Sequence, residues 1–197
     1  MRTKIAAVVF PGFELLDLFG PLELLALVGE DVSISIISKN LKTIRSGQGP
    51  SIVADSLIED AFEFDLLLIP GGIGTRKEVD NTPFINSLAR LAEECDTVAT
   101  VCTGSALLAR TGLLDAKQAT SNKIAFDWVT RQNPKVQWLR KARWVVDGKF
   151  YTSSGVAAEM DMTVALIRDL FGNTTAREVI RKAEYSWNED SEKDPFA

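Results

Sequence analysis

The sequence predicts one α/β domain with a doubly wound, mostly parallel sheet and helices on both faces. Short runs of consecutive apolar residues, of the length typical of buried parallel strands, recur along the chain. Stretches with apolar residues at helical spacing separate these runs. Strands that alternate with helices within one domain form a parallel sheet covered on both faces. The 197 residues are enough for one such domain with a substantial core.

The predicted strands are short, apolar and often β-branched, and turn residues bound most of them. They cover 4–10, 31–38, 52–55, 65–69, 97–101, 136–139, 142–146 and 150–153, with a brief extended piece at 119–122. Asp147-Gly148-Lys149 is a hairpin signal between the last two strands. The polar segment 39–50 contains two glycines and is expected to form a turn or a short hairpin.

Helices are predicted where apolar residues recur at helical spacing. They cover 58–64, 84–94, 104–110, 124–131, 157–171 and 174–183. Asn81 and Pro83 mark the start of the second, and Thr174 or Thr175 is the expected cap of the last. Gly20-Pro21 interrupts the helical pattern of 14–27. Because proline is best tolerated in a first turn, this helix is expected to begin near Pro21, leaving 13–19 as a structured loop.

The composition of the chain limits the partners and the cellular locations that are expected. The net charge of −5 argues against a nucleic-acid surface or an anionic membrane as partner. No apolar run reaches the roughly 18 residues of a membrane helix, and Met1 stands too close to the first strand for a signal peptide. With two cysteines, a cytoplasmic location is expected. A single domain is expected over residues 1–186, followed by an acidic surface tail over 187–197.

The chain contains no histidine. Pairs of Cys or Ser with His are therefore excluded within one chain, as is a histidine-ligated metal. A structural zinc site is not expected either, since only two cysteines are present. The run P-G-G-I-G lacks the spacing of a dinucleotide-binding motif. No metal and no cofactor is expected.

The most informative stretch is T-V-A-T-V-C-T-G-S-A-L-L-A-R at 97–110. This stretch predicts a buried strand, a sharp turn at Cys102 and Thr103, and then a helix. A helix N-terminus favours thiolate over thiol, and this geometry also presents the nucleophile in hydrolases with an elbow motif. Cys102 is the candidate nucleophile, and the alternative is a buried structural cysteine. Cys95 has acidic neighbours and is expected to be inert.

Three features fall at the carboxyl ends of strands, where ligands bind in such sheets. They are Asp17, Gly71-Gly72 and Cys102. Backbone N–H groups of the glycine pair and of Thr103 are candidates for an oxyanion-type site, although a plain turn is the simpler interpretation of the glycines. If Asp17 is buried near Cys102, its pKa should rise and it can act as a proton donor; otherwise it is an exposed or capping aspartate.

Four motifs extend over nearly the whole chain. They are F-P-G-F-E-L-L-D-L-F-G-P at 10–21, L-I-P-G-G-I-G at 68–74, V-C-T-G-S-A-L-L-A at 101–109 and T-S-S-G-V-A-A-E-M-D-M at 152–162. Together they resemble the ThiJ/PfpI superfamily, whose flavodoxin-like fold is shared with class I glutamine amidotransferases. Within it the chain is similar to the isonitrile hydratase branch, which implies water addition to an isonitrile to give an N-substituted formamide.

The resemblance implies catalytic roles for Cys102, Asp17 and Thr103. Substrate-binding positions are expected at Gly71, Gly72, Phe13 and Asn122, although Phe13 could instead contact a partner subunit. The sequence departs from the family at Asn122, where histidine is frequent, and at Glu159, where a small residue is usual. The absent histidine argues against protease and amidotransferase activity.

Other functions remain open beside the hydratase. The chain could instead be an oxidative-stress or redox-responsive protein in which Cys102 is oxidised, because the same turn stabilises an oxidised cysteine. A glyoxalase-like activity is a further alternative. Transcription factors that carry this domain need a DNA-binding extension, and only a short acidic tail follows the last predicted helix. The resemblance also implies a homodimer that acts on a small-molecule substrate.

Overall fold

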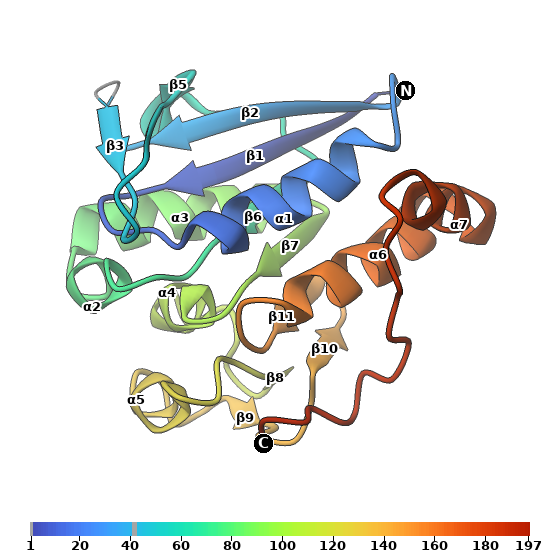
Figure 1. Cartoon of the computed structure of the whole chain (residues 1–197). Coiled ribbons are helices and arrows are strands. Elements are labelled where there is room, and N and C mark those ends of the chain that lie inside the picture. The colour runs from blue at the N-terminus through green and yellow to red at the C-terminus, as the bar shows by residue number, and fades with distance from the viewer. Residues whose placement is uncertain (1, 41–42) are drawn as a thin grey trace.

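The computed structural model describes residues 2–40 and 43–197. A seven-stranded sheet with the order β10-β11-β7-β6-β1-β2-β5 forms the centre of the domain (Figure 1). The β10–β11 pair is antiparallel, and the other neighbouring pairs of this sheet are parallel. The predicted fold class is therefore confirmed. Met1 and part of the predicted turn at 39–50 lie outside the described residues.

The strands agree closely with the predicted runs. The main sheet contains β1 (Thr3–Val9), β2 (Val32–Ser38), β5 (Ser56–Leu57), β6 (Leu66–Ile69), β7 (Thr97–Thr100), β10 (Trp144–Asp147) and β11 (Phe150–Ser153). Two smaller sheets contain β3 (Thr43–Arg45) with β4 (Ser51–Val53), and β8 (Gln118–Ala119) with β9 (Gln137–Trp138). All residues of β6 and β7 are buried, as expected for strands covered on both faces.

Helices cover both faces of the sheet. They are α1 (Leu15–Ala26), α2 (Thr75–Glu78), α3 (Thr82–Glu94), α4 (Gly104–Arg110), α5 (Phe126–Thr130), α6 (Ala158–Phe171) and α7 (Asn173–Lys182). Helices α1, α6 and α7 pack together on one face, and α2, α3 and α4 pack on the other (Figure 1). No helix among the described residues is long and apolar enough to cross a membrane.

The prediction for the first helix is wrong. Helix α1 begins at Leu15, contains Asp17 in its first turn and continues through Pro21. Proline within a helix removes one backbone hydrogen bond, at a cost of about 3 kcal/mol. The helix buries four leucines, each of which contributes about 1.5–3 kcal/mol. Tertiary packing thus outweighs the local cost, and Asp17 is fixed on a helix instead of a loop.

Other differences are local. The predicted helix at 58–64 is a short 3-10 turn over Ile58–Asp60, and α2 was not predicted. The cap of α7 is Gly172 rather than Thr174 or Thr175. The tail beyond residue 186 has no regular structure, but it is attached to the body by backbone hydrogen bonds, such as the one from the Asp194 N–H to the carbonyl of Lys141.

Candidate functional site

Three adjacent strands bring the candidate residues together. Strands β7, β6 and β1 are neighbours in the sheet, and at their carboxyl ends lie Cys102, Gly71 and the start of α1 with Asp17. The predicted convergence on one edge is therefore confirmed. This edge is also where the strand order reverses, which is the usual ligand position in a doubly wound sheet.

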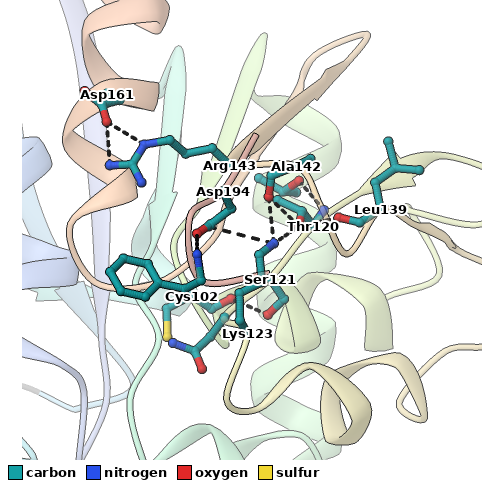
Figure 2. A network of polar contacts seen from close by, with 12 residues as sticks. Cys102, Thr120, Ser121, Lys123, Leu139, Ala142, Arg143, Asp161 and Asp194 are labelled. Atoms are coloured by element: carbon teal, nitrogen blue, oxygen red, sulfur yellow. Dashed lines mark hydrogen bonds and ion pairs between the residues drawn. The ribbon is translucent and has the colours of Figure 1, made fainter. Parts of the chain in front are cut away.

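The backbone holds Cys102 in an unusual conformation. Its φ is +54°, a region that non-glycine residues rarely occupy and that is often found at functional sites. The Cys102 carbonyl accepts hydrogen bonds from the hydroxyls of Ser105 (2.9 Å) and Ser121 (2.8 Å), and Figure 2 shows the second of these bonds. Gly104 is required at the next turn, because a Cβ there would lie 2.3 Å from the carbonyl oxygen of Ile69.

Asp17 is fully buried. Its Oδ2 accepts a hydrogen bond of 2.9 Å from the N–H of Gly71, whereas its Oδ1 has no partner among the described residues. Burial raises the pKa of Asp17 to about 7, although the Gly71 N–H and a hydrogen bond with Cys102 lower it. The predicted rise is confirmed, and Asp17 is positioned to hold a proton near neutral pH.

The protonation of Cys102 differs from the prediction. Burial and the neighbouring Asp17 raise the pKa of the Cys102 thiol well above its usual value. The N–H and hydroxyl of Thr103, which lower this pKa, do not compensate for the burial. The resting residue is therefore a thiol. A thiolate forms when the proton moves from Cys102 to the Asp17 carboxylate, so the two residues titrate as one pair.

The glycine pair does not present free donors, which corrects the predicted oxyanion role. The Gly71 N–H is bonded to Asp17, and the Gly72 N–H donates to the hydroxyl of Thr103 at 3.0 Å. Thr75 lies 3.1 Å from that hydroxyl, oxygen to oxygen. A Cβ at Gly71 would lie 2.6 Å from the Thr103 nitrogen and 2.8 Å from Asp17 Oδ2. The glycines thus hold Asp17 and Thr103 in position beside Cys102.

Phe13 and Asn122 occupy different environments. Phe13 is fully buried in the hydrophobic core, so it has no surface for a substrate, and this prediction is corrected. The Oδ1 of Asn122 accepts from the N–H of Ala125 at 2.9 Å. Asn122 also borders a cavity of about 520 Å³. The other residues of its wall are Lys123, Ile124, Arg143, Ser154, Gly155, Val156, Ala157, Ala158, Asp194 and Phe196.

The C-terminal tail forms part of this cavity wall. Asp194 is buried, and its carboxylate lies 4.0 Å from the ammonium of Lys123. Lys123 also donates to the Thr120 hydroxyl (2.9 Å) and the Ala142 carbonyl (2.6 Å), as Figure 2 shows. Burial lowers the pKa of Lys123 to about 8. These contacts were not foreseen, because Lys123 and Asp194 are far apart in the sequence.

Glu159 is a second buried carboxyl on this side of the sheet. It is fully buried in α6, and neither carboxyl oxygen has a hydrogen-bond partner among the described residues. A Cβ on Gly20 of α1 would lie 2.8 Å from Glu159 Oε1, so α1 approaches Glu159 closely only because of that glycine. Burial, and then the charge of Asp17, raise the pKa of Glu159 to about 9. Glu159 is therefore protonated at neutral pH.

The Glu159→Gln variant is expected to gain stability over wild type as the pH rises. In the unfolded chain Glu159 ionises near its ordinary pKa of 4.5, but in the folded protein it keeps its proton to about pH 9. Wild type therefore loses up to about 1.4 kcal/mol per pH unit within this window, and glutamine does not. Between pH 5 and 8 the difference should grow by about 2–4 kcal/mol. Urea unfolding of both proteins at several pH values measures it.

Glu78→Gln is the matched control for this experiment. Glu78 is also a buried carboxyl, but its Oε2 accepts a hydrogen bond from the Asn81 side chain. This variant measures how the loss of a buried carboxyl by itself changes the stability curve. Parallel stability curves for wild type and Glu159→Gln would contradict the assignment of a protonated Glu159.

The second cysteine, Cys95, is buried, and burial raises its pKa to about 11. This agrees with the expectation that Cys95 is inert.

Among residues 2–40 and 43–197, no group of three or more Cys, Asp or Glu side chains is placed to hold a metal ion.

Comparisons with known proteins agree with this geometry. The sequence model described as "DJ-1/PfpI family" matches residues 3–169. Isonitrile hydratase of Pseudomonas putida is 30% identical over 187 residues, which cover 94% of this chain and 80% of that protein. A deglycase of Thermococcus kodakarensis is 27% identical over 76% of this chain and 89% of its own length. The crystal structure of a ThiJ/PfpI family protein from Pseudomonas syringae superimposes with a TM-score of 0.87 at 26% identity, over 95% of this chain and 77% of that one.

Proposed function

The chain belongs to the DJ-1/PfpI family, and we propose that it is a cysteine-dependent hydro-lyase that adds water to an isonitrile to give an N-substituted formamide. The observation that carries this proposal is the buried Asp17–Cys102 pair in a chain without histidine. When the Asp17 carboxylate takes the proton of the Cys102 thiol, that single transfer creates both a thiolate nucleophile and a carboxylic acid. The similarity to the Pseudomonas putida isonitrile hydratase supports the choice of substrate class.

The first half of the reaction forms a covalent intermediate. A proton moves from the Cys102 sulfur to Asp17, and the thiolate attacks the terminal carbon of the isonitrile. Asp17 gives its proton to that carbon, which leaves a thioimidate on Cys102 and a carboxylate on Asp17. The Thr103 N–H and hydroxyl, which lower the pKa of Cys102, stabilise the thiolate before attack.

The second half releases the formamide. A water molecule attacks the thioimidate carbon while the Asp17 carboxylate takes one of its protons and passes it to the substrate nitrogen. The tetrahedral intermediate then expels the Cys102 thiolate, and its hydroxyl proton returns to Asp17. The formamide leaves, and the pair regains its starting protons. Gly71 and Gly72 act only by holding Asp17 and Thr103.

The direct test is turnover of cyclohexyl isonitrile or an aryl isonitrile by the wild-type protein, with the formamide identified by mass. Heat-denatured protein serves as the blank. Formamide at the rate of the blank would reject the proposed function and leave the family and fold unchanged.

A redox-responsive role of Cys102 and a glyoxalase-like activity are the alternatives that the sequence leaves open, and the Thermococcus kodakarensis deglycase adds deglycation as a third. Intact mass after titration with peroxide tests the redox role, and glycolate formation from glyoxal tests the glyoxalase-like activity. Glycolate release from a glyoxal-treated amino acid tests deglycation.

Assembly and location are also proposals. We expect a homodimer, and Leu16 and Phe19 on α1 expose apolar surface that a second copy could cover. Sedimentation velocity measures this directly. A cytoplasmic location rests on the sequence argument alone.

A further inference from the structure

The cavity beside Asn122 is enclosed by segments that are joined to the Cys102 turn. Asn122 follows Ser121, whose hydroxyl donates to the Cys102 carbonyl at 2.8 Å (Figure 2). Another part of the wall begins at Ser154, directly after β11, which is the neighbour of β7 in the sheet. A Cβ on Gly155 would lie 2.9 Å from Asn122 Nδ2, so the two parts of the wall meet there. Because β7 leads into Cys102, both parts continue from the segments that surround the proposed nucleophile.

The cavity has the size and the apolar wall of a small-molecule site. Its volume of about 520 Å³ lies within the range of roughly 300–1,000 Å³ that such sites occupy. The apolar residues of the wall are Ile124, Val156, Ala157, Ala158 and Phe196. Ile124 is 98% exposed and Phe196 is 80% exposed, so both present apolar surface that a bound apolar group would cover.

The charged side chains of the wall are already paired within the protein. The guanidinium of Arg143 binds the Asp161 carboxylate at 2.6 and 2.7 Å. The ammonium of Lys123 donates to two protein oxygens and lies 4.0 Å from the Asp194 carboxylate. A charged substituent would therefore meet no unpaired counter-charge among the described residues of the wall, and its burial there would be unfavourable.

The tail holds Phe196 at the cavity through several hydrogen bonds. Asp194 is buried, its N–H donates to the carbonyl of Lys141 at 2.8 Å, and its Oδ1 accepts from the N–H of Phe196 at 2.9 Å. Earlier in the tail, the carbonyl of Ser191 accepts from the N–H of Arg143 at 2.7 Å. The backbone that carries the Phe196 ring is therefore fixed beside the cavity, in a segment beyond residues 3–169 that the family model matches.

We propose that this cavity receives the substituent of the isonitrile and selects large, uncharged, apolar substituents. The apolar wall, the paired charges and the continuity with the Cys102 turn together specify this chemistry. The inference rests on the proposed function, because it names the substrate class of the same site. Phe196 and Ala157 are specificity determinants in this assignment, and neither takes part in the covalent steps.

The test compares n-alkyl isonitriles from ethyl to octyl, in which the isonitrile group has nearly the same intrinsic reactivity. Each methylene that enters the cavity should raise the kcat/KM of wild type by about two- to fourfold until the cavity is filled. The anion 6-isocyanohexanoate has a similar length to n-hexyl isonitrile but ends in a carboxylate. Its kcat/KM should be lower than that of n-hexyl isonitrile by about tenfold or more.

Two variants change the cavity itself. Ala157→Trp places an indole in the cavity and should abolish the dependence of kcat/KM on chain length. Phe196→Ala removes part of the wall and should lower kcat/KM for octyl isonitrile by about three- to tenfold more than for ethyl isonitrile. The matched controls are Ala26→Trp, at the exposed end of α1, and Phe62→Ala, which removes an exposed phenylalanine outside the wall. Both controls should keep the chain-length dependence of wild type.

Equal kcat/KM values across the alkyl series, or a chain-length dependence that Ala157→Trp and Phe196→Ala leave unchanged, would overturn the inference and leave the proposed function standing. A smaller species of Ala157→Trp in sedimentation velocity, with unchanged chain-length dependence, would instead assign the cavity to a contact between two copies. No formamide from any isonitrile, cyclohexyl isonitrile included, would reject the proposed function and the inference with it. If Ala157→Trp does not fold, competitive inhibition of wild type by N-octylformamide but not by N-ethylformamide, weakened in Phe196→Ala, decides in its place.

Discussion

The Cys102→Ala variant should lose isonitrile turnover completely. Alanine supplies neither the nucleophile nor the sulfur that carries the thioimidate, and no other side chain of the site provides one. The fold should persist, because Ser105 and Ser121 bind the carbonyl of residue 102 and not its side chain. Formamide production and circular dichroism of the same preparation measure the two expectations.

Cys95→Ser is the matched control for the loss of a cysteine. Cys95 is buried at the end of α3, away from the carboxyl edge of the sheet. This variant should keep wild-type kcat, although serine at a buried position lowers stability by about 1–3 kcal/mol. Near-wild-type turnover by Cys102→Ala would eliminate the covalent mechanism.

The Asp17→Asn variant should reduce kcat by about 10²- to 10⁴-fold, the usual contribution of general acid–base catalysis. Asparagine keeps the size of the side chain, but it neither accepts the proton of Cys102 nor donates one to the substrate carbon. A loss of less than about tenfold would assign the acid to another group.

The pH dependence of Cys102 alkylation separates the roles of the pair. In wild type the rate should rise as pH passes through about 7, since loss of the Asp17 proton leaves a carboxylate that can take the thiol proton. In Asp17→Asn this step should vanish, and reactivity should follow the thiol alone, whose pKa burial raises above its ordinary value. Iodoacetamide kinetics from pH 5 to 10 provide the profiles. A step near pH 7 that persists in Asp17→Asn would contradict the shared proton.

Local patterns were sufficient for most of the fold. The apolar runs located β1, β2, β6 and β7, and the pattern at 97–110 placed Cys102 at the turn between β7 and α4. The strand order placed Asp17 and Gly71 beside Cys102, because carboxyl ends of parallel strands meet at one edge.

The sequence-based predictions fail at features that contacts between distant parts of the chain determine. Pro21 signals a helix start, but burial of the leucines on α1 against the sheet and α6 determines the actual boundary. The protonation of Cys102 was mispredicted, because the extent of burial is a property of the whole fold. Arg76 and Trp128 meet across α2 and α5, and nothing in their sequence neighbourhoods indicates that contact.

The bond between the Gly71 N–H and Asp17 spans 54 residues. Asp17 and Cys102 are farther apart still in the chain, so the acid and the thiol meet only after β1, β6 and β7 have paired. Contacts of such high sequence separation form late and slowly in folding, because loop closure must precede them. A nascent or partly folded chain therefore carries an ordinary, unpaired thiol, and the reactivity profile of the native pair appears only with the assembled central sheet.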